Sequence, residues 1–282
     1  MSGHTGRGGH TDRRRPVAVP LRLRSGAVLA ITSVIGLLML AWPLLLDVSP
    51  DAERVDPPFL FLLLLPVILG VVLAEMSEGG MDARVLAVLG VLSAVNAVLR
   101  LASAGTAGLE LVFFLLILGG RVFGAGFGFV LGCTSLFASA LMTAGVGPWL
   151  PFQMLVAAWV GMGAGLLPRR VRGRGEIALL AAYGVVSAYL YGLLMNLQGW
   201  PFMAGVQVPG QDSTEISYVP GAALLDNLHH FVVYTLLTST GGWDTGRAIT
   251  NALAIVLLGP AVLVTLRRAA RRARIDPTLA PR

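Results

Sequence analysis

The side chains that could bind a small molecule gather near the ends of apolar segments. They are amides, one arginine, one glutamate and two tryptophans: Asn96, Arg100, Glu110, Trp149, Gln153, Asn196, Gln198 and Trp200. An ionisable group within an apolar helix is costly unless it is paired or lines a cavity. One interpretation is that Arg100 and Glu110 pair with each other across a short loop. The other is a substrate-binding pocket that opens outward, because small-molecule sites combine apolar walls with a few polar groups.

The sequence offers no pattern for catalysis or for a metal centre. A histidine-based metal centre needs three or more ligands, but two of the four histidines lie within 1–25 and the other two, His229 and His230, are adjacent. Adjacent side chains on a helix point about 100° apart, so these two would not readily chelate one ion. The apolar segments contain no Asp-x-x-Asp pair, and the chain has no Gly-x-Ser-x-Gly motif and no lysine. We therefore expect no catalytic residues, no bound metal and no cofactor, and we expect any ATP to be bound by another subunit.

The composition is that of a membrane protein. Hydrophobic residues make up 55% of the 282 residues and charged residues only 13%, and the mean hydropathy is +0.76. A soluble domain usually has about twice that charged fraction. All 21 basic residues are arginines, and they concentrate in 1–25, 169–174 and 267–282. Arginines that flank apolar segments indicate the cytoplasmic side of a lipid bilayer rather than a nucleic-acid interface.

Nine apolar segments are candidates for membrane-spanning helices, which need roughly 20 residues each. They cover about 26–46, 58–74, 83–101, 108–119, 122–144, 150–167, 176–197, 222–240 and 247–266. Nine crossings would place the two arginine-rich ends on opposite sides, which the charge pattern disfavours. The segment 222–240 is the most polar of the set, because it carries Asp226, Asn227, His229 and His230. We therefore predict an all-α, multi-pass protein of the plasma membrane, with about eight transmembrane helices and both termini in the cytoplasm.

This prediction divides the chain into four parts. Residues 1–25 form a disordered cytoplasmic arm, and residues 26–76 form two transmembrane helices. Residues 83–266 hold the remaining helices, with 200–240 as a structured outer segment that dips toward the membrane. Residues 267–282 form an arginine-rich cytoplasmic tail.

Two patterns of small residues predict close helix packing. The first is a stripe on one helical face: Ala83, Ala87, Gly90, Ala94 and Ala97. It serves either packing inside the protein or the docking of a helix from another protein. The second is a glycine at every fourth position: Gly120, Gly124, Gly128 and Gly132. We expect this second pattern to be structural, because glycines let helix backbones approach closely.

Several stretches of the sequence resemble one family of transport subunits. Residues 109–124, with Glu110 and Gly119-Gly120-Arg121, resemble the second helix of the substrate-specific (S) components of energy-coupling factor (ECF) transporters. The glycine-rich segment 126–132 and the stretch 145–153 are similar to the third helix and the next loop of actinobacterial S components. Residues 157–168 are similar to their fourth helix, and 238–244 also fits this group.

The resemblance extends over about 83–272 and implies a six-helix core that binds a vitamin or another micronutrient. It implies partners on other chains, namely a transmembrane coupling protein (T component) and two ABC-type ATPase subunits. In the family, the first core helix presents an Ala-x-x-x-Ala face to the coupling protein, and here this face corresponds to the stripe that begins at Ala83 and Ala87. The two helices at 26–74 depart from the family pattern. Our first expectation for the substrate is a corrinoid similar to cobalamin.

Two other functions remain open at this point. An ion-coupled secondary transporter usually has inverted repeats with broken helices at the bilayer midplane, and the sequence shows no second half that mirrors the first. A membrane scaffold without transport activity would also have extra helices and arginine-rich ends.

Overall fold

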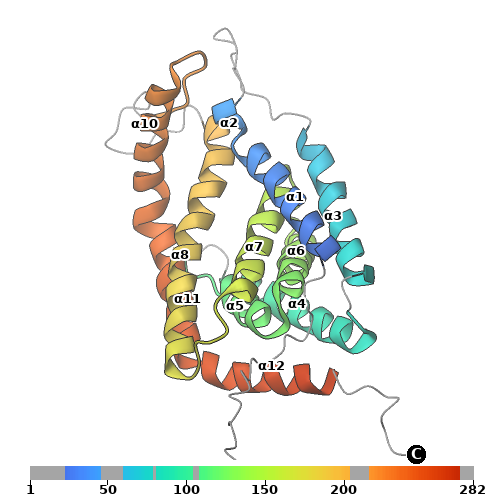
Figure 1. Cartoon of the computed structure of the whole chain (residues 1–282). Helices are drawn as coiled ribbons and strands as arrows, with labels where there is room; N and C mark the ends of the chain where they lie inside the picture. Colours follow the sequence, from blue (N-terminus) through green and yellow to red (C-terminus); the bar gives the residue numbers. More distant parts are fainter. Residues whose placement is uncertain (1–22, 46–59, 79–80, 104–107, 204–215, 274–282) are drawn as a thin grey trace, which may run out of the picture.

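All regular elements of the computed structural model are helices (Figure 1), which confirms the predicted all-α class. The structure describes residues 23–45, 60–78, 81–103, 108–203 and 216–273. Most of the predicted arm 1–25, and the predicted tail beyond residue 273, lie outside these residues. The first half contains α1 (Leu23–Leu40), α2 (Trp42–Leu45), α3 (Leu60–Glu78), α4 (Ala83–Ser103), α5 (Val112–Phe123) and α6 (Ala125–Met142). The second half contains α7 (Leu150–Leu166), α8 (Arg174–Gly199), η1 (Trp200–Met203), α10 (Leu224–Thr235), η2 (Leu236–Asp244), α11 (Thr245–Leu257) and α12 (Gly259–Ala273).

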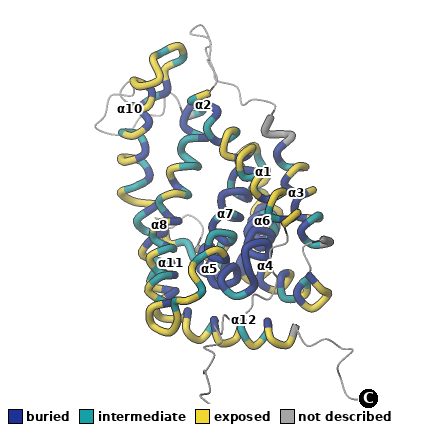
Figure 2. Tube along the Cα trace, viewed as in Figure 1, coloured by how far each residue is buried: buried dark blue, intermediate teal, exposed yellow. Residues whose placement is uncertain are grey.

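Helix α5 forms the centre of the bundle. Eleven of its twelve residues are buried, and α4, α6, α7, α8, α11 and α12 all contact it. Figure 2 shows the buried residues gathered in α5, α6 and α7, whereas α1, α10 and α12 carry many exposed ones. Twelve helical residues rise only about 18 Å, which is less than the roughly 30 Å of a bilayer's hydrocarbon core. Helix α5 is therefore too short to cross a bilayer by itself as a straight helix.

Glycines bring α5, α6 and α7 into backbone contact, which is the structural role predicted for the four-residue repeat. A Cβ atom on Gly120 or Gly128 would overlap the carbonyl oxygen of Gly161 on α7. Gly124 joins α5 directly to α6 with a φ of 113°, a conformation that residues with a side chain rarely adopt. A Cβ on Gly132 would meet the backbone of Ala158 in the same way.

Helices α1 and α2 are joined to the core by hydrogen bonds. The indole Nε1 of Trp159 on α7 donates a hydrogen bond to Ser33 Oγ on α1 at 2.9 Å. Trp42 Nε1 in α2 donates to the carbonyl oxygen of Gln198 on α8 at 3.3 Å. The two helices that precede the core thus pack on α6, α7 and α8 as part of the same bundle.

The last third of the chain differs from the predicted arrangement. The sequence predicted an outer segment at 200–240 and a separate span at 247–266. Instead, helical residues continue from Leu224 through Leu257, and the chain then bends by 67° into α12, which lies across the end of the bundle (Figure 1). Pro260 accounts for the bend, because it lacks a backbone N–H and its ring clashes with the preceding turn.

The lengths and composition of the helices are those of a multi-pass membrane protein. Among the described residues, four helices are long and apolar enough to cross a membrane, or five if the bent pair 224–272 counts as one span. Three further apolar helices have 10–17 described residues: Leu64–Met76, Val112–Phe123 and Leu150–Leu166. Helix length alone therefore does not establish the predicted number of eight.

Candidate functional site

A polar cluster lies where α5 begins, and we call it the Glu110 cluster. It comprises Glu110, Tyr191, Asp244, Arg247 and Asn251. Arg247 donates from Nε to Glu110 Oε2 at 2.7 Å and from Nη1 to Asp244 Oδ1 at 2.9 Å. The side chains of Arg247, Asp244 and Glu110 are 9%, 1% and 21% exposed. Buried charges need such pairing, since taking an ion out of water is costly.

The backbone before α5 is not helical, and the cluster satisfies its polar groups. Gly108 has a φ of 81°, and a Cβ there would overlap the backbone of Trp243. Asn251 Nδ2 donates to the carbonyl oxygen of Glu110 at 2.6 Å. Non-helical backbone at membrane depth persists only where it is buried in protein or lines a cavity. Interrupted helices beside charged groups are typical of substrate sites in transporters.

A π-helix positions Asp244 between two helices. Element η2 contains nine residues in π conformation, which is rare and occurs frequently at functional sites. The Asp244 carboxylate occupies the space that a Cβ on Gly192 of α8 would need. Its Oδ2 accepts a hydrogen bond from Ser239 Oγ at 2.8 Å. The wide helical turn and the glycine together make room for this buried carboxylate.

Polar side chains also connect α4 to α6 and α7. Three hydrogen bonds join α4 to α6: Ser93 with Thr134 at 2.7 Å, Asn96 Nδ2 to Ser135 Oγ at 3.1 Å, and Arg100 Nη1 to Ser139 Oγ at 2.7 Å. Arg100 Nη2 also donates to Gln153 Oε1 on α7 at 3.2 Å. The residue numbers of the bonded partners increase together along α4 and α6, so the two helices run parallel. We call this group the α4 ladder.

The structure brings four of the eight predicted binding residues into these two groups. Asn96, Arg100 and Gln153 belong to the α4 ladder, and Glu110 belongs to the Glu110 cluster. The guanidinium carbon of Arg247 lies 5.0 Å from the centre of the Tyr191 ring, so Tyr191 belongs to the Glu110 cluster. Glu110 forms its ion pair with Arg247.

The other four predicted residues lie elsewhere. Trp149 precedes α7 and is 49% exposed. Trp200 is 1% exposed and packs its ring against Tyr218 and Phe231 in a separate aromatic cluster. Gln198 is buried, and Asn196 is half-buried with an Nδ2 that has no partner among the described residues. Trp200, Gln198 and Asn196 thus lie at the far end of α8, beyond the level of Tyr191.

The polar residues of α10 hold a neighbouring segment in place. Asn227 accepts from the backbone N–H of Val219 and donates to its carbonyl oxygen, both at 2.9 Å. His230 Nδ1 lies 3.1 Å from the carbonyl oxygen of Ser217. No group of three or more possible metal ligands occurs in the part of the chain that the structure describes.

The small-residue stripe on α4 is exposed except at one end. Ala83, Ala87, Gly90 and Ala94 are exposed, and nothing lies within 4 Å of a Cβ built on Gly90. Ala97 is 1% exposed, so the prediction that it belongs to the same outward face is wrong. Ala97 directly follows the buried Asn96 and faces the interior of the bundle.

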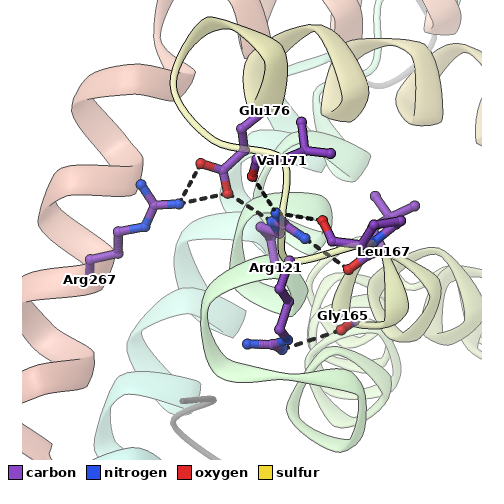
Figure 3. A network of polar contacts seen from close by, with 8 residues as sticks. Arg121, Gly165, Leu167, Val171, Glu176 and Arg267 are labelled. Atoms are coloured by element: carbon purple, nitrogen blue, oxygen red, sulfur yellow. Dashed lines mark hydrogen bonds and ion pairs between the residues drawn. The ribbon is translucent and has the colours of Figure 1, made fainter. Parts of the chain in front are cut away.

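A second ionic cluster lies at the opposite end of α5 and joins it to α8 and α12 (Figure 3). Arg121 Nε donates to Glu176 Oε1 at 2.8 Å, and Arg267 Nη2 donates to both oxygens of Glu176 at 2.7 Å. The other nitrogens of Arg121 bind three backbone carbonyls of the α7–α8 connection: those of Leu167, Pro168 and Val171. We call these residues the Arg121 cluster.

The model of the family described as "ECF transporter, substrate-specific component" matches residues 84–270. The chain belongs to this family. The match runs from α4 into α12, so it contains the Glu110 cluster, the α4 ladder and the Arg121 cluster, whereas α1 and α3 lie outside it. No curated protein and no solved structure matches the chain significantly. S components are transport subunits that work with a T component and ATPases, and they are not enzymes, which confirms the prediction on catalysis.

Several residues of this S component were not singled out from the sequence. They are Glu176, Tyr191, Asp244, Arg247, Asn251 and Arg267. The sequence did contain a signal for two of them, because Asp244 and Arg247 are ionisable residues at the start of an apolar segment. A charge at membrane depth is a functional-site hypothesis by default.

Proposed function

We propose that this S component captures a vitamin-like small molecule at the outer face of the plasma membrane. The family match to residues 84–270 carries the proposal. The proposed substrate site lies between the Glu110 cluster and the α4 ladder, with Trp149 and Gln153 at its outer edge. This placement is supported by the interrupted backbone before α5 and by the three ionisable side chains gathered there, Glu110, Asp244 and Arg247.

The proposed orientation follows from the arginines. Arg267 binds Glu176 at the start of α8, and Arg84 Nη1 donates to the carbonyl oxygen of Arg272 at 3.2 Å. The starts of α4 and α8 and the length of α12 therefore share one end of the bundle with the loop 169–174. Because loops rich in arginine remain in the cytoplasm, we place this end inside, together with both termini. In this arrangement α1, α3, α4, α6, α7, α8 and the continuous α10–α11 cross as helices, and α5 crosses together with the non-helical residues 108–111 before it. These are eight passes, and α12 lies along the inner surface.

We further propose that the exposed stripe of α4 docks on the T component, with two ATPase subunits supplying the energy. The stripe, defined now as Ala83, Ala87, Gly90 and Ala94, offers a smooth face for close helix contact. Its exposure supports this role, and so does the absence of atoms near Gly90. A corrinoid similar to cobalamin remains our first candidate for the substrate.

Co-purification tests the transport assignment. The chain is co-expressed with the T component and ATPases encoded in the same genome, and uptake is measured in vesicles that contain the purified complex. We expect an ATP-dependent complex and uptake that needs all partners. Concentration of a solute by the isolated chain, driven by protons or sodium, would contradict the proposal and indicate a secondary transporter.

Bulky substitutions test the docking face. Ala87→Leu or Gly90→Leu should abolish uptake and leave ligand affinity unchanged, because the added atoms keep the partner helix away without touching the core. Gly70→Leu on α3 is the matched control, since a Cβ on Gly70 also meets nothing within 4 Å. Uptake that survives both α4 substitutions would refute the role of the stripe.

Trp149 and Gln153 test the position of the site. The double variant Trp149→Ala, Gln153→Ala removes an exposed indole and the partner of Arg100. We expect ligand affinity to fall by about 10-fold or more, which corresponds to the loss of one well-formed polar contact and its apolar neighbour. Unchanged affinity in the purified protein would place the site elsewhere.

A further inference from the structure

Three side chains of the Glu110 cluster retain polar atoms that no described residue uses. Arg247 donates from Nε and Nη1, and Nη2 has no acceptor among the described residues. Glu110 accepts at Oε2, and Oε1 receives no hydrogen bond from the described chain. The Tyr191 hydroxyl also has no hydrogen-bond partner within the described ranges, although its ring lies 5.0 Å from the Arg247 guanidinium carbon.

These atoms remain open to a small molecule. The Glu110 side chain is 21% exposed and Tyr191 is half-buried. None of the three atoms is among the fully buried polar atoms that lack a partner. The three atoms are therefore not completely enclosed by the described chain, whereas the buried carboxylate of Asp244 is already bound by Ser239 and Arg247.

The free atoms form a donor next to an acceptor. In a guanidinium group, Nη2 shares an edge with Nε, and Nε is bound to Glu110 Oε2. The unused donor Nη2 is therefore on the guanidinium edge that faces the Glu110 carboxylate, and the unused acceptor Oε1 belongs to that same carboxylate. Two oppositely polarised groups placed side by side match a ligand edge in which a carbonyl oxygen adjoins an N–H.

The charges around the cluster restrict the kind of ligand group that can bind there. Glu110 and Asp244 carry two negative charges, and Arg247 together with Arg100 of the α4 ladder carries two positive charges, so the charges around the proposed site balance. An anionic group would meet two carboxylates, and both arginines already have partners. A cationic group would meet the guanidinium directly. A neutral group with one donor and one acceptor fits this environment best.

We propose that Glu110 and Arg247 together recognise a carboxamide or lactam edge of the transported molecule. The ligand carbonyl oxygen accepts from Arg247 Nη2, and the adjacent N–H donates to Glu110 Oε1. The Tyr191 hydroxyl supplies a third polar contact beside them. This inference rests on the proposed function, because it assumes that substrate binds at the outer end of α5. The same edge occurs in the primary amides of a corrinoid and in the ring lactam or imide of a planar heterocycle.

Binding of two vitamins and of their modified analogues tests this recognition and distinguishes a corrinoid amide from a heterocyclic lactam or imide. The full-length protein is purified in nanodiscs, and binding is measured by calorimetry with cyanocobalamin and with riboflavin. Each is compared with an analogue that lacks the edge: the monocarboxylic acids of cyanocobalamin, and riboflavin methylated at N3. We expect one parent ligand to bind and at least one of its own analogues to bind about 10-fold more weakly. If neither parent ligand binds, or if every analogue binds as well as its parent, the inference is wrong.

A conservative variant separates recognition from folding. In Glu110→Gln, the new side chain keeps an oxygen for Arg247 Nε and turns an N–H₂ donor toward the ligand. Two donors side by side match a carboxylate better than an amide. The affinity of the variant for the amide ligand should therefore fall about 10-fold, and the carboxylic acid or deprotonated analogue should bind more tightly than the amide. Asp226→Asn on the exposed face of α10 is the matched control and should change neither affinity.

A purely structural role of Glu110 would lower the melting temperature and weaken every ligand equally, and that outcome would overturn the inference. The result is independent of the transport assignment. A chain that assembles with its ATPases but prefers carboxylates would refute only the amide edge. A chain that binds the amide but never assembles would refute the proposed function instead.

Discussion

Replacement of Glu176 by glutamine should loosen the end of the bundle where α12 packs. Glu176 accepts hydrogen bonds from Arg121 on α5 and from Arg267 on α12. The Glu176 side chain is 6% exposed, and those of Arg121 and Arg267 are 4% and 29% exposed. Glu176→Gln preserves the shape of the side chain but removes the only negative charge of the Arg121 cluster.

The size of the effect follows from the burial of the arginines. Breaking a buried pair by removing one charge typically costs 3–5 kcal/mol, because the remaining charge is left without compensation. Arg121 keeps its bonds to three backbone carbonyls, and the new amide oxygen can still accept one hydrogen bond. We therefore expect the variant to lose about 3 kcal/mol of unfolding free energy. In a chain of this size, that loss lowers the melting temperature by roughly 8 °C.

Thermal unfolding in detergent measures the change, and a protease reports where it occurs. Trypsin should cleave α12 faster in Glu176→Gln than in the wild type, because α12 loses its ion pair with α8. Arg268→Gln is the matched control, since Arg268 lies on the exposed face of the same helix and surface charges contribute little. A double-mutant cycle with Arg267→Gln measures the interaction free energy between Glu176 and Arg267.

Two results would refute this reasoning. If Glu176→Gln melts within about 2 °C of the wild type, the buried pair does not stabilise the bundle as the contacts indicate. If the effects of Glu176→Gln and Arg267→Gln simply add, the two residues are not coupled, and α12 is held by its apolar face alone.

Two further predictions concern packing and turn geometry. Gly128→Ala should destabilise the protein by about 2–3 kcal/mol in thermal unfolding, because the added methyl group overlaps the backbone of Gly161, whereas Gly90→Ala should be neutral or slightly stabilising at its open position. Equal melting temperatures for the two variants would contradict the close α6–α7 contact. Asn227→Leu removes both hydrogen bonds to Val219 and should cost about 2 kcal/mol, and a melting temperature equal to that of the wild type would show that this segment is held by other contacts.

Local patterns in the sequence determined the class of the protein and much of its packing. The low charged fraction and the long apolar segments require a membrane protein of helices. The four-residue glycine repeat predicted close backbone contact, and Gly120 and Gly128 pack against Gly161. The stripe on α4 was predicted in the same way, because residues three and four apart share a helix face. These features depend on neighbours along one helix, so one sequence suffices to find them.

Tertiary structure alone decided which polar groups meet. Glu110 could pair with Arg100 ten positions away in the sequence, but its ion pair is with Arg247, 137 positions away. Local reasoning also placed Ala97 on the outward face although it is buried, and it did not indicate that Trp200 packs against Tyr218 and Phe231. Hydropathy favoured a span at 247–266, whereas Pro260 breaks the helix there and sends α12 across the bundle. The physical reason is common to all of these cases: burial and pairing depend on which helices pack together, and one helix's own periodicity does not contain that information.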